Sequence, residues 1–478
     1  MSNLDKFYIN GEWVAPASDA HPFSVTNPAT EGSEGQVFLA GKTDVDRAIQ
    51  AACDAFETFS QTPLAERVKM LERVLAGYQK HMQEMAQAIS NEMGAPLHTL
   101  AIGAQVPLGL MHVKTALDAA KNFQFERRMG SAVVRREPAG VCALITPWNW
   151  PMNQVACKVA PALVAGCTMI LKPSEFAPLS ANLFAQIMHE AGLPKGVFNM
   201  IYGDGAEVGP MLSSDPRVDM VSLTGSSRAG ESVSREAAPT FKRVALELGG
   251  KSANIILPDA DLEKAVTNGV RVMMGNTGQS CNAPSRMLVQ QDQLAQAEAI
   301  AAKTCATLKV GDPNDKDTAL GPIANQRQYE RVQQLINKGI EEGAKLVCGG
   351  PGRPEGIKQG YFARPTVFSN VNNDMEIARK EIFGPVLTMI PYKTVEDAIR
   401  IANDTDYGLS GYVYGKTEGE AAKVANRLRT GQVHLNGAQF EMNTPAPFGG
   451  YKHSGLGREW GEYGLEEFLE AKSVFHNA

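Results

Sequence analysis

The chain lacks the cysteine pattern of secreted and zinc-binding proteins. Its seven cysteines form an odd set with no C-x-x-C spacing, which argues against a disulfide framework and a structural zinc site. The N-terminus also lacks the basic start and apolar middle of a signal peptide. We therefore expect reduced thiols, no bound metal and a cytoplasmic location.

A long hydrophobic run and an excess of positive charge are missing as well. The most apolar stretch, residues 155–171, is interrupted by Lys158, Pro161 and Gly166, whereas a membrane-spanning helix needs about 20 predominantly apolar residues. The formal net charge of −6 offers no attraction to nucleic acid or to an anionic membrane. Neither is expected as a partner.

The sequence is long, and its predicted strands and helices alternate regularly. Its 478 residues exceed what one hydrophobic core normally serves, so we expect two large domains with smaller appendages. From residue 141 onward, short apolar strands alternate with helices of the length that links parallel strands. The expected strands are 141–146, 168–171, 197–202, 218–223 and 243–248, and the expected helices are 151–165, 179–191 and 226–237. This pattern predicts a parallel sheet covered on both faces and suited to binding a nucleotide.

A second alternating series follows the first. Near Ser252 it opens with a strand at 253–257, a helix at 261–274 and a strand at 287–290. Further on, Thr394 and Asp397 form a capping box ahead of an amphipathic helix. Residues 43–121 are expected to be largely helical and to pack outside the first sheet.

Two segments fit neither series, residues 122–137 and the tail 463–478. Both are expected to contain strands that leave the body of the subunit. Because unpaired projecting strands tend to aggregate, pairing with another subunit would satisfy them. We therefore expect a homo-oligomer, either a homodimer or a homotetramer.

Polar residues lie directly after several predicted strands, at the edge where open α/β sheets bind ligands. Lys172 and Glu175 could each hydrogen-bond a ribose hydroxyl, or they could belong to an ordinary solvated turn. Ser226 opens a helix whose free N–H groups and dipole would hold a pyrophosphate. Gly205 and Gly209 are rivals for that role, and neither segment has the usual G-x-G-x-x-G spacing. We favour Ser226.

Asn149 lies in the segment TPWNWP, between a predicted strand and a predicted helix. Its side-chain amide could donate to an oxyanion at the sheet edge. Alternatively, Asn149 could be the N-cap of the helix, with Pro151 at the helix start, and the local pattern favours this second interpretation.

Cys281 and Glu247 are the candidate nucleophile and base. Cys281 lies in a polar, glycine-rich loop where a thiol can be reached and can form a thioester, although a buried inert cysteine is the alternative. A cysteine hydrolase would need a histidine partner, and His434 and His453 carry no diagnostic motif. A carboxylate such as Glu247 instead suits the activation of water against an existing thioester.

Taken together, these segments resemble the aldehyde dehydrogenase superfamily, of the NAD(P)-dependent hydrolytic type, over nearly the whole chain. The matching segments are TPWNWP at Asn149, KPSE at Lys172, LTGS at Ser226, ELGGK at Glu247, GQSC at Cys281, KEIFGPV at Glu381, and PFGGYKHSGLGRE near the C-terminus. The resemblance implies oxidation of an aldehyde to a carboxylic acid through a cysteine thiohemiacetal and thioester. In it, Cys281 would be the nucleophile, Glu247 the general base, and Asn149 with the Cys281 backbone N–H the oxyanion hole.

The resemblance also implies a cofactor site. The residues expected to contact the dinucleotide are Thr146, Pro147, Trp148, Lys172, Ser174, Glu175, Gly205, Gly209, Thr224, Gly225, Ser226, Leu248, Gly249, Glu381 and Phe383. Among these, Lys172 and Glu175 would contact the adenosine ribose, and Ser226 the pyrophosphate. Glu381 and Phe383 would contact the nicotinamide ribose and ring. A carboxylate on the ribose 2′-hydroxyl would repel a 2′-phosphate, so NAD is the expected cofactor and NADP remains possible.

The family fold would divide the chain into three parts. Residues 1–121 and 140–250 would form a Rossmann-like dinucleotide-binding domain, and residues 251–450 an α/β catalytic domain. Residues 122–139 and 463–478 would form a small β oligomerisation element.

The expected substrate pocket mixes apolar and amide side chains. Its candidate residues are Trp150, Asn153, Cys157, Asn282 and Phe448. Such a pocket would take a medium-sized aldehyde or semialdehyde, and no arginine stands out as a partner for a distal carboxylate. Two alternatives remain open: a CoA-acylating aldehyde dehydrogenase, and a non-catalytic NAD-binding protein of the same fold.

Overall fold

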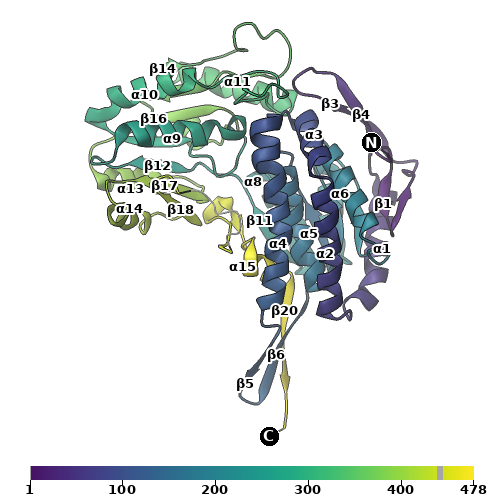
Figure 1. Cartoon of the computed structure of the whole chain (residues 1–478). Helices are drawn as coiled ribbons and strands as arrows, with labels where there is room; N and C mark the ends of the chain where they lie inside the picture. The colour runs from purple at the N-terminus through teal and green to yellow at the C-terminus, as the bar shows by residue number, and fades with distance from the viewer. Residues whose placement is uncertain (1, 439–444, 478) are drawn as a thin grey trace.

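Two large sheets organise the fold, each next to its own hydrophobic cluster (Figure 1). The computed structural model describes residues 2–438 and 445–477. Residues 1 and 478, at the ends of the expected domains, and 439–444, inside the expected catalytic domain, lie outside the described residues.

The first sheet has eight strands in the order β19-β11-β10-β7-β8-β9-β1-β2. Its central strands are mutually parallel, as predicted: β7 (Val141–Ile145), β8 (Thr168–Lys172), β9 (Phe198–Met200), β10 (Met220–Thr224) and β11 (Arg243–Glu247). Short antiparallel strands close both edges: β1 (Phe7–Ile9), β2 (Glu12–Val14) and β19 (Gly455–Leu456). The strand order reverses between β7 and β10, and ligands of open α/β sheets bind outside the carboxyl ends at such a point.

Helices cover both faces of this sheet. On one face lie α1 (Lys42–Phe59), α7 (Gly205–Ser214) and α8 (Ser227–Ala237). On the other lie α5 (Pro151–Ala165) and α6 (Pro178–Glu190), with α2 (Leu64–Lys80), α3 (Met82–Met93), the π-helical segment η1 (Leu97–Gln105) and α4 (Val106–Asn122) packed outside them. The predicted helical layer from residues 43–121 is therefore confirmed, except that α1 contacts the sheet directly.

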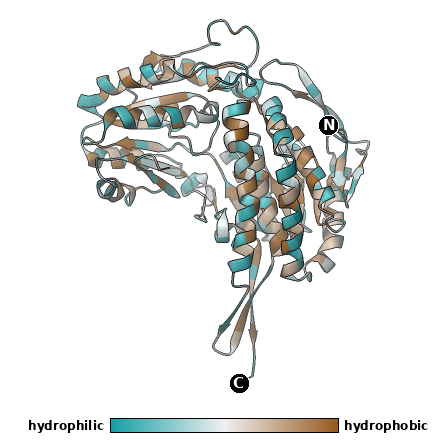
Figure 2. Ribbon diagram, in the orientation of Figure 1, coloured by the Kyte–Doolittle hydropathy of each residue, from teal (hydrophilic) through white to brown (hydrophobic). Residues whose placement is uncertain are grey.

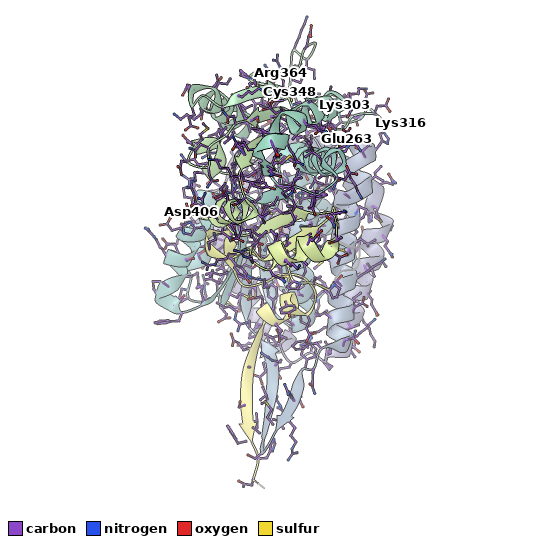
Figure 3. All side chains as sticks on the ribbon, turned by 90° about the vertical axis from the view of Figure 1, so that its left-hand side faces the viewer. Glu263, Lys303, Lys316, Cys348, Arg364 and Asp406 are labelled. Carbon is purple, nitrogen blue, oxygen red and sulfur yellow. The ribbon has the colours of Figure 1, made fainter. Side chains whose placement is uncertain are left out.

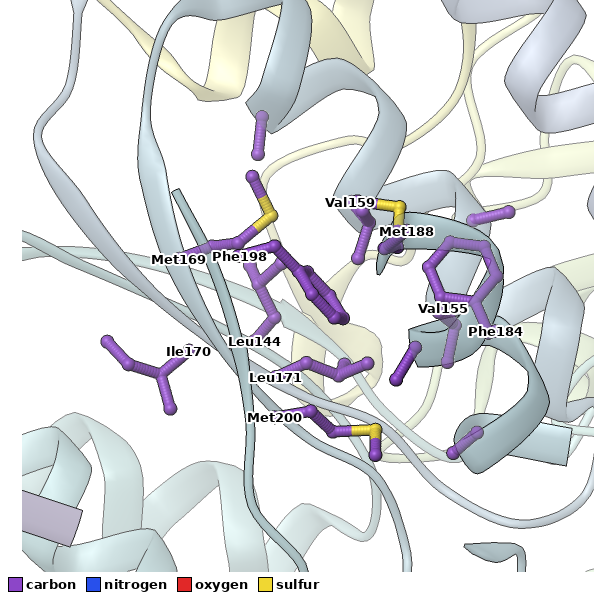
Figure 4. Close-up of a cluster of buried hydrophobic side chains, with 14 of the residues drawn as sticks. Leu144, Val155, Val159, Met169, Ile170, Leu171, Phe184, Met188, Phe198 and Met200 are labelled. Carbon is purple, nitrogen blue, oxygen red and sulfur yellow. The ribbon is translucent and has the colours of Figure 1, made fainter. Parts of the chain in front are cut away.

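The core of this half forms where strands and helices present apolar side chains to each other. Figure 4 shows Leu171 of β8 and Leu144 of β7 facing α5 and α6, whereas Ile170 points to the opposite side of the sheet. This alternation is what strand geometry imposes, and helices on both faces bury each side. Every residue of α5 is buried, and Figure 2 shows hydrophobic and hydrophilic residues alternating along the helices packed around it.

The stretch Leu97–Asn122, made of η1 and α4, is long and apolar enough to cross a membrane by length and composition alone. It packs along α5 and also contacts α2 and α15 (Gly461–Glu467). Half of its most apolar window is buried inside the protein. Its apolar character is thus used in packing against neighbouring helices.

The second sheet has seven strands in the order β14-β15-β16-β13-β12-β17-β18. Its strands are β12 (Ala253–Ile256), β13 (Arg286–Gln290), β14 (Lys345–Cys348), β15 (Thr366–Ser369), β16 (Val386–Tyr392), β17 (Ser410–Tyr414) and β18 (Gln432–Leu435). All pairs are parallel except β14 with β15. Its helices are α9 (Leu262–Met274), α10 (Leu294–Ala306), α11 (Gln326–Glu341), α12 (Glu376–Arg379), α13 (Val395–Asn403) and α14 (Glu418–Ala425). The capping box predicted at Thr394 and Asp397 is present at the start of α13.

The smaller elements are a hairpin and several short helical turns. They are β3 (His21–Thr26), β4 (Ser33–Leu39), η2 (Ala238–Thr240), η3 (Gly275–Gly278), η4 (Gln291–Gln293) and η5 (Lys452–Ser454). The hairpin was not predicted from the sequence.

A separate three-stranded sheet projects from the body, as Figures 1 and 3 show from two sides. It contains β5 (Glu126–Met129), β6 (Ala132–Pro138) and β20 (Leu469–Phe475) in the order β20-β6-β5. The prediction of a strand in the tail holds only from residue 469. The preceding residues belong to helix α15, because Leu465 is fully buried in the first core. Phe475, at the end of β20, is 77% exposed.

Candidate active site

A cleft of about 920 Å³ lies where the carboxyl edge of the first sheet meets the amino edge of the second. The segments after β7, β10 and β11 form one wall, and the segment before β13 brings the nucleophile loop to it. The predicted site residues that line this cleft are Pro147, Trp148, Asn149, Thr224, Gly225, Ser226, Glu247, Leu248, Gly249, Cys281, Glu381 and Phe383. Residues from both halves of the chain therefore meet at the point where the first sheet reverses its strand order.

Cys281 follows the tight turn η3, in which Asn276 and Thr277 adopt left-handed backbone conformations with φ of 51° and 55°. The Cys281 side chain is partly exposed to the cleft. Burial, followed by the carboxyl groups of Glu381 and Glu247, raises the pKa of the Cys281 thiol. In the protein alone the thiol is therefore protonated at neutral pH and needs a base to become a nucleophile.

Glu247 is the last residue of β11 and is buried. Among the described residues, neither of its carboxyl oxygens has a hydrogen-bond partner. Burial and then the Glu459 carboxylate raise the pKa of Glu247 well above its usual range, although Lys158 and Arg458 oppose that shift. Lys158 and Glu459 form a buried ion pair with each other. Glu247 thus has two oxygens free to accept a proton inside the cleft.

Asn149 does not act as the N-cap of α5, so that interpretation was wrong. The N-cap is Trp150, which makes no capping side-chain bond. The Asn149 Nδ2 group instead donates to the Gln279 carbonyl at 3.0 Å, in the loop that carries Cys281. Asn149 therefore makes a hydrogen bond to a residue distant in sequence and does not make the local capping bond that the sequence favoured. This bond orients the amide beside the nucleophile and leaves its second N–H for a ligand oxygen.

Ser226 is the N-cap of α8, and its Oγ accepts the Ala229 N–H at 3.3 Å. The N-terminus of α8 opens into the cleft beside Gly225 and Ser226. The rival residues Gly205 and Gly209 lie in the first turns of α7, whose N-cap is Asp204, and they are absent from the cleft lining. The geometry therefore favours the α8 N-terminus as the place for an anionic group.

Lys172 and Glu175 are not a solvated turn. The Lys172 side chain is buried, and its Nζ donates to the carbonyls of Pro173 at 3.1 Å and Gly203 at 2.8 Å, and lies 3.7 Å from Glu175 Oε2. Glu175 lines a second hollow of about 460 Å³ that shares Phe176 and Asn325 with the cleft. The other two predicted residues here, Thr146 and Ser174, are buried and do not line the cleft.

Glu381 and Phe383 lie on the wall supplied by the second sheet. The Gly250 N–H donates to Glu381 Oε1 at 3.1 Å, and burial raises the pKa of Glu381 to about 7. Phe383 has a left-handed backbone with φ of 56° and meets Trp148 edge-on, with ring centroids 5.4 Å apart. Gln328 holds this turn by donating to the carbonyl of Phe383 at 3.0 Å.

Helix α11 supplies cleft residues that were not predicted from the sequence. Arg327, Arg331 and Gln334 lie on one face of its N-terminal half, with Gln328 beside them. None of them follows a strand, so the search at strand ends missed them. The spacing i, i+4, i+7 of two arginines and a glutamine on an amphipathic helix was the available signal. These cations add positive charge to a cleft suited to a diphosphate.

The predicted substrate residues divide into two groups. Cys157 and Phe448 form an apolar cluster with Leu409 and Trp460, against which Cys281 packs. Phe448 stacks on Trp460 with centroids 4.5 Å apart. These contacts place Cys157 and Phe448 beside Cys281, and they add the aromatic residue Trp460, which was not predicted.

The polar candidates make defined contacts of their own. Trp150 Nε1 donates to Ser280 Oγ at 2.8 Å, directly before the nucleophile. The Asn282 carbonyl accepts from the Tyr412 hydroxyl at 3.0 Å. Asn153 Oδ1 lies 2.6 Å from Nε2 of the buried His112, so its side chain is engaged with α4.

Comparison with known proteins agrees with this geometry. The family model described as "Aldehyde dehydrogenase family" matches residues 13–474. The chain is 57% identical to a 3-succinoylsemialdehyde-pyridine dehydrogenase of a Pseudomonas species, over 99% of both chains. The crystal structure of a mutant of aldehyde dehydrogenase C from Pseudomonas syringae, complexed with NAD⁺ and octanal, superposes with a TM-score of 0.97 at 53% identity, covering 99% of this chain and 97% of that one.

A second solved structure has the same fold. The Mycobacterium tuberculosis aldehyde dehydrogenase complexed with NAD⁺ has a TM-score of 0.95 at 41% identity, covering 99% of this chain and 98% of that one. The predicted fold class and the prediction of an enzyme are confirmed. The chain belongs to the aldehyde dehydrogenase family.

Proposed function

We propose that the protein oxidises an aldehyde to a carboxylic acid with NAD⁺, through a covalent intermediate on Cys281. The observation that carries the proposal is the shared cleft: the thiol of Cys281, the unpaired carboxyl group of Glu247 and the amide of Asn149 meet there beside the α8 N-terminus. A thiol, a base and a preset donor are the groups that acyl chemistry on a carbonyl requires.

The chemistry of the residues that line the cleft suits a dinucleotide. The cleft volume is in the range of cofactor pockets, and it runs from the α8 N-terminus to Glu381. The chemistry that bound NAD⁺ supplies is the acceptance of hydride from the substrate carbon. The chain's part is to hold the pyrophosphate near Ser226, and the nicotinamide ribose and ring near Glu381 and Phe383.

In the first stage, Cys281 Sγ gives its proton to solvent in the open cleft and bonds to the aldehyde carbon. The carbonyl oxygen becomes an alkoxide, which the free N–H of Asn149 and the Cys281 backbone N–H would stabilise by several kcal/mol together. Loss of hydride from the thiohemiacetal leaves a thioester on Cys281. In the second stage, Glu247 takes a proton from water, the resulting hydroxide attacks the thioester carbon, and the acid leaves as the thiolate is released.

The residues Cys281 and Glu247 support two alternative functions less well than they support the proposed one. A CoA-acylating enzyme would pass the acyl group to a thiol and would have no need for the unpaired Glu247 carboxylate. A non-catalytic NAD-binding protein would have no need for either Cys281 or Glu247.

We further propose that the substrate is a medium-sized aldehyde with an apolar or aromatic body. The wall beside Cys281 contains the stacked rings of Phe448 and Trp460, and Trp150 contacts the residue before the nucleophile. One relative is named a 3-succinoylsemialdehyde-pyridine dehydrogenase, and a mutant of another was crystallised in complex with octanal.

The test is a panel of straight-chain, aromatic and dicarboxylic semialdehydes assayed with NAD⁺. We expect NADH formation and free acid as product, with the rate rising from mildly acidic to mildly alkaline pH. The sign follows from burial, which raises the pKa of both the Cys281 thiol and the Glu247 carboxyl, so each must lose a proton at higher pH than usual before it can act. An acyl-CoA product formed only when CoA is added would favour the acylating alternative, and no NADH with any aldehyde would refute the proposal.

Cofactor preference depends on Glu175. Its carboxylate lies 3.7 Å from Lys172, at the end of β8 where a ribose would lie, and would repel a 2′-phosphate. We expect kcat/KM to favour NAD⁺ over NADP⁺ in the parent enzyme and the ratio to fall at least about tenfold in Glu175→Gln, since one lost charge repulsion is worth about 1.4 kcal/mol or more. Lys195→Gln, in the turn before β9, serves as a control that removes one surface charge and its exposed ion pair with Glu12. A parent enzyme that prefers NADP⁺ contradicts the assignment.

The larger organisation completes the proposal. Residues 1–121 and 140–250 form the dinucleotide-binding domain and residues 251–450 the catalytic domain. Residues 122–139 and the part of 463–478 that follows helix α15 form an oligomerisation element that joins subunits into a dimer or tetramer through its projecting strands. A cytoplasmic location is proposed because all seven cysteines are unpaired thiols.

A further inference from the structure

We infer that Asn276 is a positioning residue that sets the separation between the two donors of the oxyanion hole. The inference rests on the proposed function, in which Asn149 and the Cys281 backbone N–H stabilise the alkoxide. Asn276 touches neither substrate nor cofactor in this scheme, and it acts through the backbone of both donors' loops.

The contacts of Asn276 join the two walls of the site. Its Nδ2 group donates to the carbonyl of Asn149 at 2.9 Å and to the carbonyl of Gln279 at 3.1 Å. The first carbonyl belongs to the loop after β7, and the second lies two residues before Cys281. One planar amide therefore bridges the loop that carries the side-chain donor and the loop that carries the backbone donor.

Neighbouring side chains fix the orientation of this amide. Gln105, at the end of η1, donates through Nε2 to Asn276 Oδ1 at 3.4 Å and to the Asn149 carbonyl at 3.1 Å. Gln279 Nε2 donates to the main-chain carbonyl of Asn276 at 3.1 Å, which holds the backbone that carries this amide. Asn276, Gln105 and Gln279 are each at most 3% exposed. The amide cannot turn without losing bonds that water has no access to replace.

The same contacts show that the role of the Asn276 side chain is positional. Its hydrogen bonds are not needed to give the two buried carbonyls a partner. Each carbonyl that Asn276 bonds has a second donor: Asn149 Nδ2 for the Gln279 carbonyl, and Gln105 Nε2 for the Asn149 carbonyl. Removing the Asn276 side chain therefore leaves no buried carbonyl without a partner. What is lost is the bridge between the two loops.

Loss of the bridge should slow the chemical step. The Asn149 amide takes its orientation from the Gln279 carbonyl, so movement of that carbonyl displaces the side-chain donor and the Cys281 loop together. A displacement on the order of 1 Å in a catalytic site can cost about a hundredfold in rate. Once displaced, the two donors no longer hydrogen-bond the alkoxide, so it should form more slowly. The affinity for NAD⁺ should not change.

The backbone conformation of Asn276 determines the choice of variants. With φ of 51°, a β-branched or bulky residue would be strained there, whereas glycine adopts this conformation freely. Asn276→Gly therefore removes the amide without backbone strain. Asn276→Asp keeps the shape and the tolerance for this conformation but replaces both donor hydrogens with an acceptor oxygen. Thr277→Gly is the matched control, because Thr277 has the same backbone conformation and its hydroxyl donates to the Gly321 carbonyl, away from both loops.

The experiment measures the rate of the first NADH turnover at saturating aldehyde and NAD⁺, together with NAD⁺ affinity and Tm. We expect Asn276→Gly and Asn276→Asp to lower that rate on the order of tenfold to a hundredfold, with NAD⁺ affinity unchanged. The Tm of Asn276→Gly should be close to that of Thr277→Gly, whereas Asn276→Asp, which sets an acceptor against two buried carbonyls, should have a lower Tm. Thr277→Gly should keep the parent rate to within about threefold.

A double-mutant cycle separates positioning from general destabilisation. If Asn276 acts through Asn149, the effect of Asn276→Gly should shrink to roughly threefold or less in an Asn149→Ala background. An unchanged factor in that background, or an equal loss in Thr277→Gly, would overturn the inference while leaving the proposed function intact. A parent enzyme that forms no NADH with any aldehyde would instead overturn the proposed function, and this inference with it.

Discussion

Cys281→Ala is expected to abolish both the first NADH turnover and steady-state oxidation, by on the order of 10⁴-fold or more, as loss of a covalent nucleophile does in other enzymes. In the proposed mechanism Cys281 supplies the atom that bonds to the aldehyde carbon, and no other thiol lines the cleft among the described residues. Stopped-flow measurement of NADH gives both phases. Binding of NAD⁺ to the variant should persist, which shows that the fold is retained.

Cys348→Ala is the control for this experiment. Cys348 is half-buried on the edge strand β14 of the second sheet, far from the nucleophile loop in sequence, and is labelled in Figure 3. We expect it to keep the parent activity. Substantial NADH formation by Cys281→Ala would mean that hydride leaves the substrate without a covalent adduct at this position.

Glu247→Gln is expected to separate the two stages. Glutamine preserves the shape of the buried side chain but cannot take a proton from water, so acylation should proceed and deacylation should stall. We expect a burst of about one NADH per subunit followed by steady-state turnover lowered by about 10² to 10⁴-fold, the usual contribution of a general base. Intact-protein mass spectrometry should then detect the acyl group on Cys281.

Glu247→Asp is an informative companion, because it keeps the carboxylate and shortens its reach. It should show the same burst with a smaller loss of steady-state rate. Neither Glu247 oxygen makes a hydrogen bond to the described residues, so neither variant removes such a bond, and Tm should stay near the parent value. Equal losses in the burst and in the steady state would reassign Glu247 to deprotonation of the Cys281 thiol.

The first sheet could be predicted from sequence because its strands are buried on both faces. Strands such as β7 and β8 are short apolar runs bounded by helices, and the bounds of α5 agree with those expected. The edge strands β1, β2 and β19 are only two or three residues long. Runs of that length carry no periodicity, so they could not be recognised without the partners they pair with.

In the site, side chains at strand ends could be predicted and those placed by tertiary contacts could not. Glu247 and Ser226 occupy the expected edge because parallel strands end together. Asn149 was misjudged because its partner, Gln279, is distant in sequence, and local capping rules contain no information on such a contact. Arg327 and Arg331 reach the cleft only through the packing of α11, which the sequence pattern does not specify.

The glycine pair between Glu247 and β12 limits how this enzyme can diverge. A β-carbon on Gly250 would lie 2.4 Å from the Cys281 carbonyl oxygen, and one on Gly249 would lie 2.3 Å from Glu381 Oε2. Neither position can gain a side chain without pushing apart groups that the chemistry needs in place. Natural drift or directed evolution toward new aldehydes therefore has to act through the aromatic wall at Phe448 and Trp460. Residues there can change size without moving the two glycines away from Cys281 and Glu381.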